Sequence, residues 1–303
     1  LGILLMNIIG FGFVAAAYTV PGLMIEDGAD VFAWGVIELT AEGSMRGLFS
    51  ILFGAGVILF LGNKREGGGW LHAKRTTWLL MFGLFNGYVL LWTGDILVTY
   101  ALAGFLLYFF RKLEARTLLR LAIGLTVLIT LYSIASHFGI KYLRANAETA
   151  AAQQSADQPV PEDVAALAQQ WEDFKSDYAL TNEMIDQEVS ARGGSFESAF
   201  MWTAHHNTVI LMSSLWGFLL PDALVMMILG MALYKLGVLQ GQCAREVYAK
   251  MAVAGFAIGF AINGFEVWFA YQSQFDLIDA FLKLAPTYHL GRMAVTLGWI
   301  GLL

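Results

Sequence analysis

The sequence predicts an all-α fold: a polytopic bundle of about eight membrane-spanning helices with an external, mostly helical loop. Three observations support this prediction. Of the 303 residues, 58% are hydrophobic and only 14% are charged, whereas soluble domains usually carry about 25% charged residues. The mean hydropathy is +0.62, and the apolar runs are continuous, without the alternation of a membrane β-barrel. Nine Trp and 22 Phe residues suit the aromatic belts of membrane interfaces.

The spans follow from the length that a helix needs, which is about 20 apolar residues for a hydrocarbon core of about 30 Å. The predicted spans are 1–20, 45–62, 76–93, 95–110, 117–142, 208–236, 250–271 and 288–303. An alternative divides 208–236 at Pro221 into two spans, but it would move Arg245 and Lys250 to the acidic side. We instead expect a kinked or interfacial helix before the true crossing, with the break at Pro221, which lacks a backbone donor.

Basic residues predict the orientation, because cytoplasmic loops are rich in Lys and Arg. They gather in three short loops: Lys64, Arg65, Lys74 and Arg75; Arg111, Lys112, Arg116 and Arg120; and Lys235, Arg245 and Lys250. If these loops are cytoplasmic, the chain enters from the cytoplasm. The acidic loop that holds Glu26, Asp27 and Asp30 then lies outside.

The domain organisation follows from this topology. Residues 1–142 form a membrane part with five spans, residues 143–205 form an external segment, and residues 206–303 form a membrane part with three spans. The external segment reads as a linker followed by an amphipathic helix. Its start is predicted after Pro161 and its end at Gly193–Gly194. We expect it to cover the outer mouth of the bundle.

Composition also excludes several classes of function. The single cysteine, Cys243, cannot build a disulfide framework or a Cys-based metal site, and no metal site is predicted. No basic stripe lies outside the short loops, so nucleic acid is not an expected partner. The expected partners are membrane lipid and a small-molecule acceptor or transported solute. Both ends of the chain fall inside apolar runs, so we expect the natural chain to continue beyond them.

Asp95 stands at a Thr-Gly-Asp step between two apolar runs, which predicts a hairpin tip on the outer side. There Asp95 can cap the following helix, take part in a site, or do both. Glu38, Glu42 and Arg46 have the i, i+4, i+8 spacing of one helical stripe. Arg46 then forms a rim ion pair with Glu42, or binds an anion in an outward-facing vestibule.

Other polar residues at membrane depth are also candidates, because burying them is costly. Asn86 is expected to hydrogen-bond across helices. Glu266 either reaches toward the interface or bonds to an Asn on another helix. His205 and the adjacent His206 point in different directions on a helix, so they are not a metal pair; either could be a general base or a surface residue. Gly54 and Gly56 permit close helix approach.

Four stretches carry a family resemblance: LGILLMNI, EGSMRGLFSILFGAG, KRTTWLLMFGLFNGYVLLWTGDILVTYALAG and ILGMALYKLGVL. They resemble the bacterial YeiB-like membrane proteins, a family catalogued as domain of unknown function four hundred and eighteen. The most specific patterns are RxLFSxLFG and GDILxxYAL. This family is similar to membrane acyltransferases, including heparan-α-glucosaminide N-acetyltransferase-like and sugar O-acyltransferase proteins. The resemblance implies a bacterial inner-membrane protein with a cytoplasmic N-terminus, in which a helical bundle moves an acyl group from a cytoplasmic acyl-CoA to an acceptor outside.

One departure from the family pattern concerns the catalytic base. Many relatives carry His where this chain has Asn86, and an amide cannot accept a proton near neutral pH. The base would then be Asp95, Glu266, His205 or His206, unless the chain lacks the chemistry.

The leading hypothesis is an outward-opening acyltransferase site lined by Arg46, Asn86, Asp95 and Tyr100. Asp95 would activate the acceptor, and Arg46 would stabilise negative charge in the transition state. Lys74 and Arg75 could hold the phosphates of a CoA donor, although positive-inside topology explains the same charges. The alternatives are a small-solute transporter and a non-catalytic membrane scaffold, so the sequence leaves open whether the protein is an enzyme.

Overall fold

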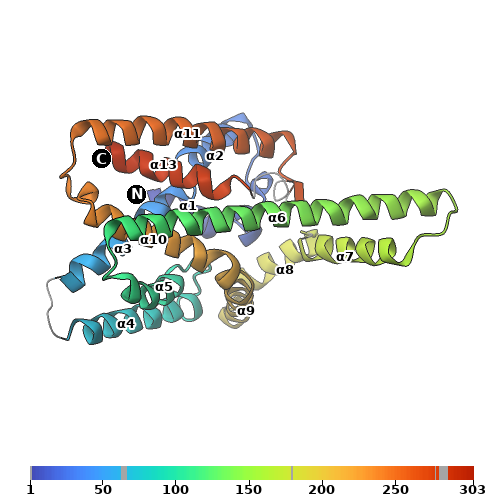
Figure 1. Ribbon diagram of the computed structural model, residues 1–303. Helices are drawn as coiled ribbons and strands as arrows, with labels where there is room; N and C mark the ends of the chain where they lie inside the picture. The colour runs from blue at the N-terminus through green and yellow to red at the C-terminus, as the bar shows by residue number, and fades with distance from the viewer. Residues whose placement is uncertain (1, 63–66, 179, 277, 280–285) are drawn as a thin grey trace.

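The structure is a computed structural model that describes residues 2–62, 67–178, 180–276, 278–279 and 286–303, and within these residues all regular elements are helical (Figure 1). The α-helices are α1 (Gly2–Gly12), α2 (Gly28–Thr40), α3 (Ser44–Gly62), α4 (Gly68–Tyr88), α5 (Leu97–Phe110), α6 (Ala115–Ser155), α7 (Glu162–Tyr178), α8 (Asn182–Arg192), α9 (Phe196–Ser214), α10 (Leu220–Lys235), α11 (Arg245–Gln272) and α13 (Tyr288–Leu302). The all-α prediction is confirmed.

Four described stretches are long and apolar enough to cross a membrane: Gly28–Gly62, Ala115–Ser155, Phe196–Lys235 and Arg245–Gln272. Helices α1 and α5 are apolar but shorter. The count of eight spans stays a prediction. For the first of them, 1–20, the structure differs, because α1 ends at Gly12 and short 3₁₀ turns follow at Ala15–Tyr18 and Pro21–Leu23.

Helices α3 and α10 cross at the centre of the bundle, and two glycines make this crossing close. A Cβ added to Gly54 would collide with the backbone carbonyl of Met227, and a Cβ added to Gly230 would collide with that of Ile51. Ile51 and Met227 are fully buried. The expected close helix approach is therefore found at Gly54, whereas Gly56 faces open space.

The described residues of the three basic loops lie at one end of the bundle, whereas Lys64 and Arg65 of the first loop lie outside the described residues. Lys235, the last residue of α10, donates hydrogen bonds to the carbonyls of Arg111 (2.8 Å) and Leu113 (2.6 Å) between α5 and α6. His72 near the start of α4 contacts the carbonyl of Gly104 on α5 at 2.9 Å, so α4 and α5 form an antiparallel hairpin. We call this end, where α10 also turns into α11, the basic end. If all the basic loops are cytoplasmic, they must lie on the same side of the membrane, and their position at one end of the bundle agrees with this.

The chain bends where the sequence predicts a kink. A π-helical turn, Leu215–Leu219, separates α9 from α10, and Pro221 lies in the first turn of α10. In Figure 1 α9 is seen almost end-on, whereas α6 and α11 run across the view. A single bent segment thus replaces the rejected pair of spans.

The external segment differs from the prediction in its first part. The residues expected to be a linker continue α6 to Ser155, because the stretch is rich in Ala and Gln, which favour helix. As predicted, helix begins directly after Pro161 and stops before Gly193, which is the C-cap of α8. The single predicted helix is instead two, because α7 ends at Tyr178 and α8 begins at Asn182. Figure 1 shows α7 running alongside the far part of α6, beyond the bundle.

Helix α8 packs against the end of α1 and the short turns that follow it. The buried carboxylate of Glu188 accepts hydrogen bonds from the backbone N–H of Ala15 (2.8 Å) and from Arg192 (2.6 Å). Arg192 also donates to the carbonyls of Gly10 and Phe13, each at 3.3 Å. Helix α8 thus packs on the N-terminal turns, whereas α7 packs on α6. That this segment covers the outer mouth of the bundle stays a prediction.

Candidate functional site

The charged side chains of five helices and one turn meet at the end of the bundle opposite the basic end. We call them the charged cluster: Glu38, Glu42, Arg46, Asp222, Glu266, His289 and Arg292. Glu38 comes from α2, Glu42 from the turn after it, and Arg46 from the first turn of α3. The other members lie near the start of α10, in the second half of α11, and in the first turns of α13.

The turn between α2 and α3 allows Arg292 to enter the cluster. Gly43 has φ +60°, a backbone conformation that glycine adopts without strain, and a Cβ there would collide with Cδ and Nε of Arg292. This turn interrupts the helical stripe that was predicted through Glu38, Glu42 and Arg46. The three residues still meet at one site, because the chain re-enters helix at Ser44.

Arg292 pairs with Glu42. Its Nε donates to Oε2 of Glu42 at 2.6 Å, and Nη2 donates to the same oxygen. The Arg292 guanidinium lies over the ring of Tyr288, and its side chain is only 6% exposed. The predicted Glu42–Arg46 pair is therefore wrong, since Glu42 is taken by a residue 250 positions away.

Arg46 pairs with Asp222, which also holds His289. Nη2 of Arg46 lies 3.0 Å from Oδ2 of Asp222, and Nδ1 of His289 lies 3.0 Å from Oδ1. The side chains of Asp222 and His289 are each 12% exposed. The expectation that Arg46 is paired is confirmed, and one carboxylate joins α3, α10 and α13.

Tyr100 extends this group toward the bundle core. Its hydroxyl lies 2.5 Å from that of Ser50 and donates to the backbone carbonyl of Arg46 at 3.3 Å. Tyr100 is 1% exposed. Arg46 and Tyr100 are thus neighbours, as the shared-site hypothesis requires.

Asn86 and Asp95 form a separate pair. Nδ2 of Asn86 donates to Oδ1 of Asp95 at 2.9 Å, and Oδ2 of Asp95 accepts the N–H of Val98 in the first turn of α5 at 3.0 Å. In this turn outside the helices, burial raises the pKa of Asp95, while the hydrogen bonds from Asn86 and Val98 oppose the rise. The predicted capping role is confirmed. Across the described residues, no hydrogen bond or ion pair links Asn86 or Asp95 to Arg46.

The capping role predicts a stability difference between two substitutions. Asp95→Ala removes the acceptor for the Val98 N–H and should cost about 1 kcal/mol of the free energy of unfolding. Asp95→Asn keeps an oxygen at that position and should cost less. Thermal unfolding in one detergent measures both. Equal losses would show that the charge of Asp95, not its cap, stabilises this turn.

Among the described residues, no hydrogen bond or ion pair joins the other predicted site residues to Asp95. Glu266 accepts a hydrogen bond from Thr287 at 2.6 Å, so the predicted Asn partner is wrong, although Glu266 does belong to the charged cluster. His205 is exposed on α9, and the ring of His206 stacks on Trp202 at 4.7 Å. A role of His205 in chemistry stays a prediction.

Asp222, His289 and Arg292 were missed by sequence reasoning. The available signal was the presence of ionisable groups at membrane depth, since Asp222 stands in a long apolar run and Arg292 in the last predicted span. Their partners could not be read from local spacing.

Lys74 and Arg75, the predicted phosphate ligands, are exposed near the basic end of α4. The Arg75 guanidinium lies over the ring of Phe60 at 5.3 Å. The two adjacent cations suit a phosphate, but they lie at the opposite end from the charged cluster and do not line its cavity. Among the described residues, no group of His, Cys, Asp and Glu has the arrangement of a metal site.

Comparison with known proteins supports a relationship over part of the chain. Across 108 residues, 34% of the chain, the sequence is 39% identical to the uncharacterized protein YeiB of Escherichia coli (strain K12). Across 106 residues it is 36% identical to the uncharacterized protein YxaH of Bacillus subtilis (strain 168). The match spans about a quarter of the length of each relative, 26% in both cases. These similarities support a YeiB-like family and do not extend to acyltransferases.

No family model matches the chain, and no solved structure matches it.

Proposed function

We propose that this chain is part of a multi-pass membrane protein that transfers an acyl group to a hydroxyl or amine acceptor, with His289 as general base. The observation that carries the proposal is the 3.0 Å contact between Nδ1 of His289 and Oδ1 of Asp222. An ionised carboxylate only accepts hydrogen bonds, so Nδ1 carries the proton of this contact, and in a neutral imidazole Nε2 then carries the lone pair that a base needs.

Asp222 can orient the His289 ring because its own carboxylate is held in place by two partners, Arg46 and His289. Arg46 holds its other oxygen at 3.0 Å, so the carboxylate stays ionised and the imidazole keeps one orientation. A base oriented by a carboxylate is the arrangement that activates hydroxyl nucleophiles in unrelated enzymes. His289 therefore replaces the histidine that the family resemblance leads one to expect at Asn86.

In the proposed reaction, Nε2 of His289 takes the proton of the acceptor as its oxygen or nitrogen attacks the acyl carbon. The thioester C–S bond breaks, and the same proton passes to the departing thiolate. An acyl-CoA donor is the proposed source of the acyl group. Lys74 and Arg75 lie at the opposite end of the bundle from His289, so they do not hold the phosphates of a donor whose thioester reacts at His289. We place the charged cluster on the outer side of the membrane and the basic end in the cytoplasm, on the positive-inside argument.

The test uses the full-length protein in nanodiscs with acetyl-CoA, and with glycerol and propylamine as hydroxyl and amine acceptors, measuring release of free CoA. A general base contributes about 10²–10⁴-fold to a rate, so His289→Gln should lower CoA release at least about 100-fold. His137→Gln, on α6, is the matched control and should keep the rate. Loss of activity in His205→Gln in place of His289→Gln would move the base to α9. Absence of CoA release from the unsubstituted protein would reject acyl transfer and favour the solute-transport alternative.

A further inference from the structure

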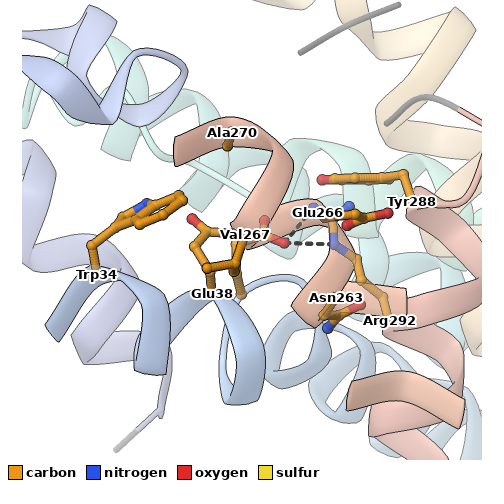
Figure 2. A pocket seen from close by; sticks show the side chains of 9 residues that line it. Trp34, Glu38, Asn263, Glu266, Val267, Ala270, Tyr288 and Arg292 are labelled. Atoms are coloured by element: carbon orange, nitrogen blue, oxygen red, sulfur yellow. Dashed lines mark hydrogen bonds and ion pairs between the residues drawn. The ribbon is translucent and has the colours of Figure 1, made fainter. Parts of the chain in front are cut away.

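A cavity of about 90 Å³ lies between α2, α11 and the start of α13. The side chains that matter here are those of Trp34, Glu38, Asn263, Glu266, Tyr288 and Arg292 (Figure 2). A cavity of this volume has room for several water molecules or for a small ligand.

The charges around the cavity do not balance. Three carboxylates line it, those of Glu38, Glu42 and Glu266, against one guanidinium, that of Arg292. Arg292 is already paired with Glu42. Within the part of the chain that the structure describes, neither Glu38 nor Glu266 has an ion pair of its own. Carboxylates that are half-buried, as these are, gain from a compensating cation or proton.

A second observation points to a ligand independently of the carboxylates. Nη1 of Arg292 is buried without a hydrogen-bond partner, although its side chain is only 6% exposed. Figure 2 shows the Arg292 side chain reaching toward Glu266 and Tyr288. Oδ1 of Asn263, also lining the cavity, is buried without a partner as well. Unsatisfied buried groups of this kind are costly unless something binds them.

The walls of the cavity favour an organic cation over a metal ion. The ring of Trp34 lies beside Glu38 in Figure 2, and aromatic faces attract ammonium groups. No arrangement of His, Cys, Asp and Glu suited to a metal ion occurs among the described residues. The free N–H of Arg292 additionally calls for an acceptor atom on the ligand.

We propose that this cavity binds a small organic ammonium compound that also carries a hydrogen-bond acceptor. Glu38 and Glu266 hold the ammonium group, and Arg292 Nη1 donates to the acceptor. The site does not depend on acyl transfer, and its test measures binding without any reaction.

The experiment is a thermal-shift titration of the full-length protein in nanodiscs with ethanolamine, which carries both groups. A ligand that binds only the native state raises its apparent stability in a saturable way. Ethylammonium lacks the hydroxyl acceptor and should bind more weakly. Ethylene glycol lacks the charge and should give no shift at the same concentrations.

Two isosteric variants locate the site. Glu38→Gln and Glu266→Gln should each raise the dissociation constant for ethanolamine about 10-fold or more, since each removes a charge-assisted hydrogen bond. Glu148→Gln, on the exposed side of α6, is the matched control and should leave it unchanged. Unfolding midpoints without ligand establish that each variant is folded.

Three results would overturn the proposal. They are no saturable shift with ethanolamine, an equal shift with ethylene glycol, and equal binding by the Glu38, Glu266 and Glu148 variants. Because CoA release is not measured, each of these results leaves the acyl-transfer proposal to its own test.

Discussion

Replacing Asp222 by alanine should cost about 3–5 kcal/mol of the free energy of unfolding, because removing one partner of a buried ion pair leaves the other charge uncompensated. Here two partners lose their carboxylate, Arg46 and His289, each at 3.0 Å. The expected result is a large fall in the thermal unfolding midpoint in one detergent, together with loss of CoA release.

Two comparisons make this result interpretable. Asp279→Ala breaks an exposed pair with Arg144, whose two side chains are 45% and 43% exposed, and should cost less than about 1 kcal/mol. The double variant Arg46→Ala, Asp222→Ala should be more stable than the sum of the two single losses predicts, since no buried guanidinium is left unpaired. Additive losses would show that Arg46 and Asp222 act independently.

Replacing Gly54 by alanine should prevent the native crossing of α3 and α10. The added Cβ would overlap the Met227 carbonyl, which is backbone and cannot rotate away. Overpacking a core costs about 1–3 kcal/mol even where side chains can adjust, so a backbone collision at the centre should cost more. The measurement is the yield of monodisperse protein and its thermal unfolding midpoint.

Gly56→Ala is the matched control on the same helix. Nothing lies within 4 Å of a Cβ at Gly56, and alanine favours helix over glycine by about 1 kcal/mol. This variant should be as stable as the original or slightly more so. If both substitutions are tolerated equally, the close crossing at Gly54 does not exist in the membrane.

Local features of the fold were readable from the sequence. Helix α3 begins at Ser44, against a predicted start at 45, and both end at 62. The start of α7 after Pro161 and the bend before Pro221 follow from the chemistry of proline. The cap at Asp95 likewise depends on residues only three positions apart. Each of these signals lies within one or two turns of helix.

The charged cluster was only partly readable, because its pairs join distant parts of the chain. Glu42 and Arg292 are 250 residues apart, and Arg46 and Asp222 are 176 apart. The i, i+4 spacing of Glu42 and Arg46 favoured a local pair, but the turn at Gly43 separates them and each finds a partner on another helix. Ionisable side chains in apolar runs mark such sites, whereas the sequence does not say which of them meet.

The length of α6 has a practical consequence for the whole molecule. At about 1.5 Å per residue, its 41 residues form a rod of about 60 Å, twice the hydrocarbon thickness of about 30 Å. The far end of this rod, with α7 folded back along it, must therefore stand in water well beyond the lipid headgroups. A protease or a membrane-impermeant label can reach the Ala156–Pro161 connection from one side only, so a single cut or label there reports which way the protein is inserted in the membrane of a living cell.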